Sequence, residues 1–341
     1  MRRSDAESYF SRMKTSHPTR LPESDHDADI IHLHWVGRWL DLTSFVESIP
    51  LHIPIVWTIH DMSPLAGGCI SDFNCPQWEH ECRTCPLLRS PMNRIWARHE
   101  LKRRRIALQP RKLCAVANSN YTRRMTEKSL VFENPYSVHT IHPGIDVENY
   151  EAIETSEAKQ SLGIPPGKFV VGFGAASVTD EIKGCDHFIA TVNELNRKID
   201  NLHVLIFGEG SPTLQIDAPL TELGMLKTQD QQSAAYSAMD AFVIASKMET
   251  FGQVASEAQA CGTPTYAFDV GGLSDAISNG KTGGIVPHAD CKALANLIRE
   301  DRESGKLAAM ADKCREWVSV NFSLEQSTNA YLDVYHSALS S

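Results

Sequence analysis

Residues 246–257 read Ser-Lys-Met-Glu-Thr-Phe-Gly-Gln-Val-Ala-Ser-Glu and follow an apolar run, Ala241 to Ala245, that is typical of a buried strand. The small residues after this run predict a helix that begins near Gly252 and carries Glu257, eight positions after Glu249. At about 1.5 Å of rise per residue, the two carboxylates lie on the order of 10 Å apart, which is too far for an acid–base pair but suits an elongated ligand. Unpaired N–H groups at the helix N-terminus between them attract phosphate. Taken alone, the pair fits better a structural interpretation, in which Glu249 favours a helix N-terminus and Glu257 is a solvated surface residue. The buried strand before the pair and the rest of the chain favour a ligand site instead.

Short β-branched runs alternate with helical patterns on both sides of this stretch, which is typical of α/β folds with parallel sheets. Strands are expected at residues 29–35, 53–59, 113–117 and 138–142, and then at 169–174, 202–207, 241–245, 265–268 and 284–286. Helices are expected near 38–48, 93–109 and 120–130. The last helix begins after Ser323, with Gln326 completing a capping box, and presents one apolar stripe, Ala330, Tyr331, Val334, Tyr335 and Leu339.

Length and composition exclude several classes of protein. At roughly 150 residues per domain, 341 residues with 42% apolar and 22% charged residues predict two folded domains. A net charge of -9 argues against a nucleic-acid partner, although residues 89–128 hold 12 Lys and Arg against two Glu. The sequence shows neither a membrane-spanning apolar run nor an apolar signal peptide, so a cytoplasmic location is expected.

Further motifs occur in a fixed order around the first stretch: Pro143-Gly144-Ile145-Asp146, Lys183-Gly184, Gly208-Glu209-Gly210, Val270-Gly271-Gly272 and Gly280-Lys281-Thr282-Gly283. With Glu249, Phe251, Gly252 and Glu257, they cover nearly all of residues 29–341, and this series resembles the retaining glycosyltransferases of family 4 (glycosyl transferases group 1). The resemblance implies the GT-B fold, which is an α/β fold with two Rossmann-like lobes. Residues 1–142 would form the acceptor lobe and 143–321 the donor lobe, with the helix at 322–341 packing back on the first lobe.

The resemblance also implies an activity, the transfer of a sugar from a nucleotide-diphosphate donor, with retention of configuration. The acceptor would be a glycan, a lipid-linked sugar or a cell-surface polysaccharide. Catalytic roles fall to Glu249, His60 and Lys183, with Lys183 on the pyrophosphate. Glu257 would bind the ribose hydroxyls, and the rest of the donor site would comprise Phe251, Gly252, Gln253, Gly208, Met225 and Leu226. Because a lysine and oriented N–H groups stabilise a departing diphosphate, no catalytic metal is expected.

His60 follows the strand expected at 53–59, and ligands of parallel sheets bind at such strand ends. The resemblance places His60 beside the reacting sugar, although a histidine here can equally be structural. His32 and His34 share one strand face and suggest an alternative, a metal-dependent hydrolase. That class is disfavoured because the later strand ends offer glycines and glutamates. A dehydrogenase is also disfavoured, because the Gly172-x-Gly174 fingerprint lacks an acid at the end of the next strand.

Four of the nine cysteines, Cys69, Cys75, Cys82 and Cys85, fall within seventeen residues. Cys82 and Cys85 have the spacing of a zinc knuckle, and the other two could complete a structural zinc site. His80 could replace one ligand, and four reduced thiols packed with Trp78 remain the alternative.

A basic helix is expected within residues 94–112. Its cations Arg94, Arg98, Lys102 and Arg105 lie beside Ile95, Trp96, Leu101 and Leu108 at helical spacing. A solvated helix face and a peripheral contact with anionic lipid, at the inner face of the membrane, both fit this pattern.

The resemblance implies an initial strand and a Gly-rich loop, and residues 1–26 show neither. Two alternatives to an active enzyme follow. One is a glycosyltransferase-like protein that binds a nucleoside diphosphate with little or no turnover, and the other is an adaptor that binds polyanions or membranes.

Overall fold

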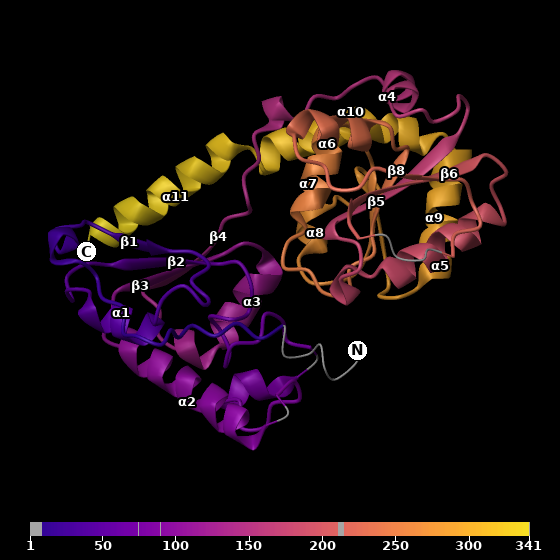
Figure 1. The fold of residues 1–341 in the computed structure, drawn as a ribbon. Helices are drawn as coiled ribbons and strands as arrows, with labels where there is room; N and C mark the ends of the chain where they lie inside the picture. The colour runs from indigo at the N-terminus through magenta and orange to yellow at the C-terminus, as the bar shows by residue number, and fades with distance from the viewer. Residues whose placement is uncertain (1–8, 74, 89, 211–214, 341) are drawn as a thin grey trace. The chain divides into compact units, whose positions relative to one another are not determined.

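The computed structural model describes residues 9–73, 75–88, 90–210 and 215–340, which form two compact α/β units (Figure 1). The first unit comprises Met1–His142 and Asn329–Ser341, and the second comprises Pro143–Thr328. The second boundary between the units falls inside the last helix, α11 (Leu324–Leu339).

The first unit is built on a four-stranded parallel sheet in the order β1-β2-β3-β4. Its strands are β1 (Ile31–Leu33), β2 (Ile55–Ile59), β3 (Leu113–Ala117) and β4 (Ser137–Thr140). The connecting helices are α1 (Leu42–Ser48), α2 (Pro91–Leu108) and α3 (Asn120–Lys128). Each of these elements overlaps one that the sequence predicts. β1 and β2 are shorter than predicted, β3 has the predicted bounds, and β4 begins one residue earlier and ends two residues earlier.

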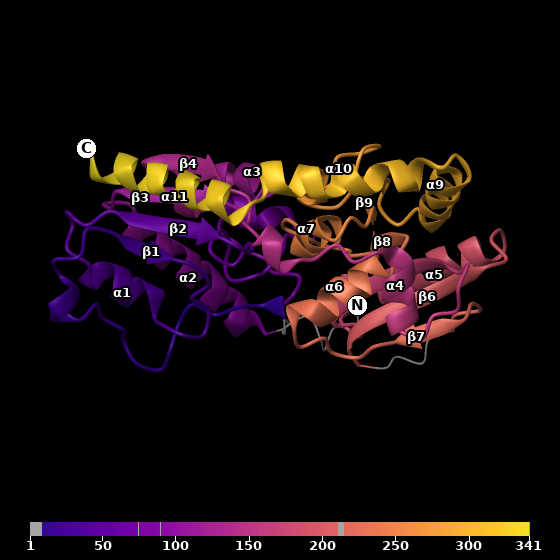
Figure 2. The same ribbon diagram turned by 90° about the horizontal axis from the view of Figure 1, so that it is seen from above.

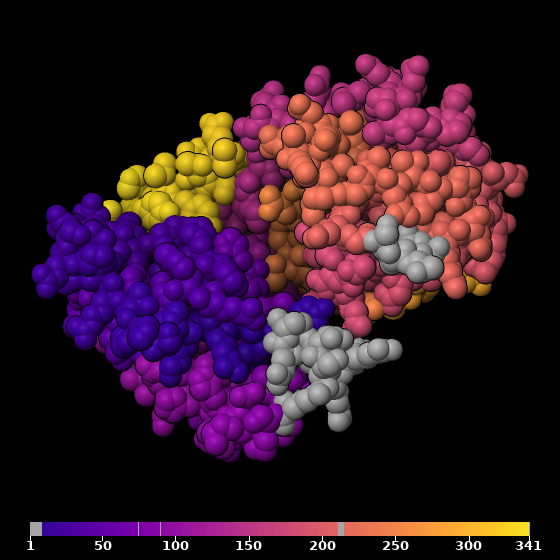
Figure 3. Space-filling model, viewed as in Figure 1, coloured from indigo at the N-terminus to yellow at the C-terminus, as the bar shows by residue number. Residues whose placement is uncertain are grey.

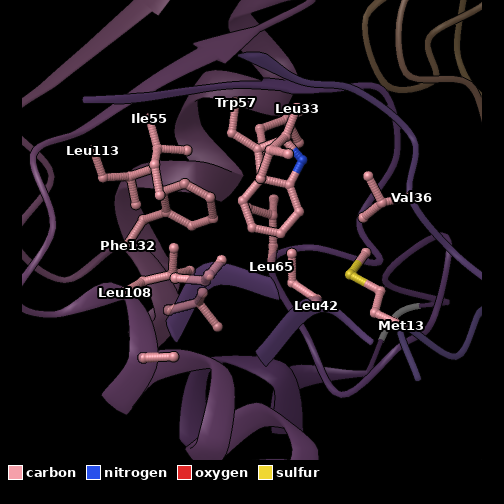
Figure 4. Packing of buried hydrophobic residues seen from close by; sticks show 14 of the residues in the cluster. Met13, Leu33, Val36, Leu42, Ile55, Trp57, Leu65, Leu108, Leu113 and Phe132 are labelled. Atoms are coloured by element: carbon pink, nitrogen blue, oxygen red, sulfur yellow. The ribbon is translucent and has the colours of Figure 1, made fainter. Parts of the chain in front are cut away.

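Alternate residues of β2 face two different cores, because successive side chains of a strand point to opposite faces. Ile55, Trp57 and Ile59 face a cluster that includes residues of α1, α2 and α3. Figure 4 shows the rings of Trp57 and Phe132 packed together in this cluster, with their centroids 5.8 Å apart. Val56 faces the opposite way, into a cluster that α11 covers.

Helix α11 begins as the sequence predicts, because the hydroxyl of Ser323 accepts a hydrogen bond from the Gln326 N–H at 3.3 Å. Its predicted apolar stripe is correct except at the end. Val334 and Ala338 are buried against the β-sheet of the first unit, whereas Leu339 is half exposed. Figure 1 and Figure 2 both show α11 running along this sheet.

The segment before β1 packs on the first unit although it forms little regular structure over residues 9–30. Phe10 pairs with Cys69 as an isolated bridge, and Met13 and Leu21 join the core of the unit. The predicted lack of an initial strand and Gly-rich loop concerns residues 1–26, of which 1–8 lie outside the described residues.

The second unit is built on a six-stranded parallel sheet in the order β10-β9-β8-β5-β6-β7. Its strands are β5 (Phe169–Ser177), β6 (Leu202–Glu209), β7 (Leu220–Glu222), β8 (Ala241–Ile244), β9 (Thr265–Phe268) and β10 (Gly283–Val286). Five of these strands are predicted from the sequence. The edge strand β7 is not, because it has three residues that are all at least partly exposed.

Helices cover both faces of this sheet, so the unit is doubly wound. One face packs on α5 (Cys185–Asn196) and α9 (Cys291–Glu303), which contact each other (Figure 2). The other face packs on a layer with α6 (Gln229–Ser237), α7 (Gln253–Ala260), α8 (Leu273–Ala276) and α10 (Lys306–Asn321). The remaining helix, α4 (Thr155–Ser161), adjoins α6. No helix of the described residues is both long and apolar enough to cross a membrane.

Candidate active site

The central strand β5 of the second unit pairs with β6 on one side and with β8 on the other. The chain passes from β5 to β6 through α5, but reaches β8 only after β7 and α6. This reversal of strand order is a topological switch point, where the loops after the two central strands diverge and leave room for a ligand. The loops after β5 and β8 carry Lys183 and Glu249, respectively.

Lys183 and Glu249 form an ion pair, in which Nζ lies 3.1 Å from Oε2. Both side chains are partly buried, so the pair is better shielded than one on an open surface. Lys183 ends a short 3-10 helix, Glu181–Lys183, which the Asp180 side chain caps by accepting the Ile182 N–H at 3.0 Å. The sequence predicts both residues at the donor site, but assigns them to different parts of the donor.

Glycines hold the two loops against each other. Gly184 has φ of +70°, and a Cβ there would lie 1.9 Å from the carbonyl oxygen of Ala245, just after β8. Gly271 has φ of +58°, and its Cβ would lie 1.6 Å from the carbonyl oxygen of Glu249. The loop after β9 therefore packs directly on the main chain of Glu249, and the Gly272 N–H donates to that carbonyl at 3.2 Å.

Gly252 is the N-cap residue of α7, with φ of +94°. It has no side chain to cap the first turn, so the N–H groups of that turn remain available to an anion. Phe251 is buried and packs edge-on against Phe322, so only its main chain can serve a ligand. Gln253, the first residue of α7, is exposed.

Glu257 lies on α7 and is held by two tyrosines. The hydroxyl of Tyr236 donates to Oε2 at 2.9 Å, and the hydroxyl of Tyr150 is a second partner. Burial raises the pKa of Glu257, and the two tyrosine hydrogen bonds oppose this shift. The carboxylate is therefore a positioned acceptor and not the solvated surface residue that the spacing alone allowed.

Gly208 and the segment Gly224 to Leu226 lie together, because the Gly208 N–H donates to the Gly224 carbonyl at 2.8 Å. A Cβ at Gly208 would lie 2.0 Å from the carbonyl oxygen of Ala175, and φ is +133°. Met225 is 45% exposed and Leu226 is partly buried. Gly208 lies near the carboxyl end of β6 and residues 224–226 follow β7, so both lie at the same edge of the sheet as Lys183.

The first unit brings His60 and His34 together at the carboxyl ends of β2 and β1. Nδ1 of His34 lies 3.0 Å from Nε2 of His60, and the rings stack. Such a hydrogen bond needs one protonated and one bare nitrogen, so the two rings cannot both be charged while it persists. Burial lowers the pKa of both rings, and at His60 the neighbouring His34 lowers it further.

His32 belongs to a different environment. Its Nδ1 lies 2.7 Å from the Tyr335 hydroxyl and its Nε2 lies 2.9 Å from the Thr58 hydroxyl, so both ring nitrogens are occupied by partners on α11 and β2. Burial, followed by the charges of His34 and His60, lowers the pKa of His32 to about 4. His32 is therefore a structural residue beneath α11, which argues against the metallohydrolase alternative.

Metal ligands are not gathered in this structure: over the described ranges, no three His, Cys, Asp or Glu side chains are arranged to hold one ion. The four clustered cysteines are free thiols, and Trp78 beside them is buried in the core of the first unit.

A basic pocket of about 610 Å³ lies in the first unit. Its lining includes three cations, Arg12, Lys14 and Arg38, together with Thr15 and Ser16. The Thr15 hydroxyl donates to the His17 main-chain oxygen at 2.5 Å, and Nζ of Lys14 lies 3.9 Å from Oε1 of Glu100. The sequence analysis did not find this pocket, because Arg38 is distant in sequence from the other four residues. Likewise it missed Tyr150 and Tyr236, which reach Glu257 only through the fold.

The family model and the curated relatives that this chain resembles are all glycosyltransferases. Residues 168–300 match the family model described as glycosyl transferases group 1. The D-inositol 3-phosphate glycosyltransferase of Rhodococcus erythropolis is 31% identical over 225 residues, which cover 60% of this chain and 49% of that protein. The corresponding enzyme of Nocardia farcinica is 26% identical over 334 residues, covering 91% of this chain and 67% of that protein. The chain thus spans about half the length of the relatives that it matches at 31% identity.

Two solved structures share the fold of nearly the whole chain. Sucrose-phosphate synthase from Thermosynechococcus elongatus has a TM-score of 0.67 at 21% identity, covering 91% of this chain and 73% of that one. Anabaena HepE in complex with UDP-glucose has a TM-score of 0.64 at 18% identity, covering 92% and 80%. The chain therefore has the two-lobed GT-B fold. Within it, residues 168–300 are a domain of the group 1 glycosyltransferase type.

Proposed function

We propose that this protein transfers a sugar from a nucleotide-diphosphate sugar, with retention of anomeric configuration. The observation that carries the proposal is the Lys183–Glu249 ion pair at the β5–β8 switch point, in front of the uncapped N-terminus of α7. Transfer breaks the bond between the anomeric carbon and the diphosphate, and negative charge grows on the departing oxygen. A fixed ammonium group and oriented N–H groups stabilise that charge.

In this proposal the donor rearranges the ion pair. The diphosphate competes with Glu249 for the Lys183 ammonium group, since phosphate oxygens are strong charge-assisted acceptors. Glu249 is then released to accept hydrogen bonds from hydroxyl groups of the donor sugar. Lys183 and α7 take the place that a divalent cation has in metal-dependent transferases, so turnover should persist in a chelator.

Glu257 would accept hydrogen bonds from the ribose hydroxyls. Its tyrosine partners fix the carboxylate, and a carboxylate has more acceptor sites than these two bonds use. Gly208 and the Gly224 to Leu226 segment would border the base. His60, whose pKa is lowered by burial, stays uncharged at pH 7 and would hydrogen-bond a hydroxyl group of the reacting sugar.

The test is a donor screen with UDP-, GDP- and ADP-sugars that measures the release of nucleoside diphosphate in the presence of a chelator. Glu249→Gln should reduce turnover by about a hundredfold or more. Glu316→Gln, an exposed position on α10, serves as the control and should not. Turnover that disappears with chelator and returns with Mn²⁺ would refute the metal-free part. Nucleotide binding without turnover would instead identify a glycosyltransferase-like nucleotide-binding protein.

For the acceptor, we propose a phosphate-bearing molecule, such as a lipid-linked sugar diphosphate. The support is the pocket with Arg12, Lys14 and Arg38, because three cations suit an anion. Lys14→Gln together with Arg38→Gln should raise KM for a phosphorylated acceptor by about tenfold and leave donor hydrolysis unchanged. An equal loss in both reactions would show that the pocket does not serve the acceptor.

A peripheral contact with anionic membrane through α2 and the residues up to 112 is a further proposal. The exposed face of α2 carries Met92, Ile95 and Ile106, which are 71%, 64% and 56% exposed, with Lys102 between them. Such a mixture of apolar and basic side chains suits a lipid interface. Figure 3 shows the surface of this part of the chain at the lower edge of the first unit.

The structure also corrects the predicted composition of this face. Leu101 and Leu108 are buried, and Trp96 packs on Phe10, so none of them is offered to lipid. Among the predicted cations, two are paired, Arg98 with Glu81 and Arg105 with Glu133.

Co-sedimentation with vesicles containing anionic lipid tests this contact. Lys102→Glu and Ile95→Glu should weaken binding severalfold, since each lipid-facing cation contributes about 1 kcal/mol. Lys313→Glu, an exposed change on α10, should have no effect. Equal binding to neutral vesicles would refute an electrostatic contact.

A further inference from the structure

Four cysteines of the first unit have no part in the proposed transfer. Cys69, Cys75, Cys82 and Cys85 lie in the connection between β2 and α2, and all four are free thiols. The described regular structure between Cys69 and Cys85 is one short 3-10 helix, Pro76–His80, so this segment has little secondary structure to hold it.

Three of the four cysteines pack on shared hydrophobic clusters of the first unit. Cys82 belongs to the main core cluster of the first unit, and Cys69 packs against the same cluster. Cys69 and Cys85 both pack against a second cluster of Phe10, Leu88 and Ala97. The thiols also interact electrostatically. Burial raises the pKa of Cys69, and the neighbouring Cys82, Cys85 and Cys75 raise it further.

Main-chain N–H groups point at two of the sulfur atoms. The N–H groups of Gln77 and Trp78 donate to the sulfur of Cys75, and that of Gly67 donates to the sulfur of Cys82. A thiol is a weak acceptor, whereas a thiolate is charged and gains more from each such bond. Burial raises the pKa of both thiols, and these N–H groups oppose that rise, so they are donors available to a thiolate once a metal ion displaces the proton.

A buried cation lies beside the cluster. Arg104 is 3% exposed, and its Nη1 donates to the main-chain oxygens of Ser63, Pro64 and Ala66 at 2.7, 2.8 and 3.0 Å. Burial lowers the pKa of Arg104 to about 10, while Glu100, then Cys82 and Cys69, act in the opposite direction. Carbonyl oxygens satisfy its hydrogen bonds, and the carboxylates of Glu100 and Asp61 supply part of the negative charge that compensates it. A buried cation needs such compensation.

We propose that Cys69, Cys75, Cys82 and Cys85 bind one structural zinc ion. Four thiolates complete a tetrahedral, closed site, and Cys82-x-x-Cys85 has the spacing that such sites use. Each thiol releases its proton to solvent on binding, and the resulting centre carries a net negative charge that Arg104 offsets in part. The ion holds the segment in place and takes no part in transfer.

The four side chains do not surround one point in the structure as it stands: within the described ranges, no three ligand-type side chains are placed to hold an ion. Binding therefore requires rotation of cysteine side chains. Zinc binding would also offset main-chain strain at Glu81 and Cys82. Neither residue is a glycine, and their φ values are +71° and +50°.

Elemental analysis of the full chain, purified without added metal and without a histidine tag, tests the proposal. We expect about one zinc ion per chain, released by a mercurial that blocks thiols. Cys75→Ser and Cys85→Ser, both at partly exposed positions, should lower the zinc content about tenfold. Cys291→Ser, at a partly exposed cysteine in the second unit, is the control and should retain zinc.

Circular dichroism distinguishes loss of metal from loss of folding in each variant. If a variant fails to fold, the zinc content of the unmodified chain still decides the matter. A folded, unmodified chain with less than about a tenth of an ion per molecule would overturn the proposal, as would iron in place of zinc. Retention of zinc in both folded variants would overturn it too. None of these outcomes bears on the donor site.

Discussion

Gly271 links the main chain at the candidate site to the stability of the second unit. A methyl group there would collide with the carbonyl oxygen of Glu249 at 1.6 Å, in addition to the strain of a positive φ. We predict that Gly271→Ala lowers the free energy of unfolding by about 3–4 kcal/mol. Gly280 has a similar φ of +79° but open space around it, so Gly280→Ala should cost only about 1–2 kcal/mol. Urea unfolding of the two variants measures the difference, and equal losses would contradict the close packing on Glu249.

The stability of the first unit should depend on pH through His32. Its pKa is lowered to about 4 from an ordinary value of 6.5, so the unfolded chain binds the proton more readily than the folded chain. Stability is therefore complete above pH 6.5 and falls as the pH drops toward 4. The loss should be about 1 kcal/mol, because solvent screens a ring that is only partly buried.

Urea unfolding between pH 7 and pH 4 measures this effect, with His32→Asn as the comparison. Other groups titrate in the same range, and the variant isolates the contribution of His32. The stability of the variant should fall less steeply with decreasing pH, and an identical slope in both proteins would contradict the assignment.

Single residues show where sequence reasoning reaches its limit. The ordered series of motifs and the family that it resembles, rather than residue types and spacing alone, place Lys183, Glu249 and Glu257 at a predicted site for a phosphate-containing ligand. Their mutual contacts do not follow from spacing, because Lys183 meets Glu249 only through the adjacency of β5 and β8. Tyr236 and Tyr150 likewise contact Glu257 only through the fold, and no local sequence pattern predicts either contact.

Helix α11 shows how well an amphipathic pattern fixes a buried face. Val334 is 2% exposed against the sheet of the first unit, whereas Leu339 is 50% exposed. Val334→Ala should cost about 1–2 kcal/mol of stability through lost packing. Leu339→Ala should cost less than about 0.5 kcal/mol. Thermal unfolding followed by circular dichroism compares them, and equal effects would show that α11 does not pack through this face.

Elements with a strong period are predicted well, and short edge elements are not. The buried strands β2, β3, β5 and β8 are apolar runs bounded by turn residues, so composition alone marks them. β7 has three residues, none of them buried, and its pairing with β6 rather than its composition makes it a strand. The stripe on α11 fails at Leu339 because Ala338, four residues after Val334, lies on the buried face instead.

At the scale of the whole molecule, two α/β units follow from the alternation of strands and helices and from the turn-rich residues 143–146. The packing of the last helix on the first unit is what the family resemblance implies. The order β10-β9-β8-β5-β6-β7 does not follow from that alternation, since several strand orders satisfy it. The order matters because it creates the switch point at β5 and β8, and so brings together residues that the sequence analysis could only place on separate loops.

The central claim is that the second unit holds a nucleotide-diphosphate sugar at this switch point. Titration calorimetry of the full chain with UDP, GDP and ADP, in the presence of a chelator, tests it most directly. We predict binding of at least one of these nucleotides. Glu257→Gln should weaken that binding by about tenfold to a hundredfold, and Glu316→Gln should leave it unchanged. Absence of binding by all three nucleotides to the folded chain, or equal affinity in both variants, would contradict the account.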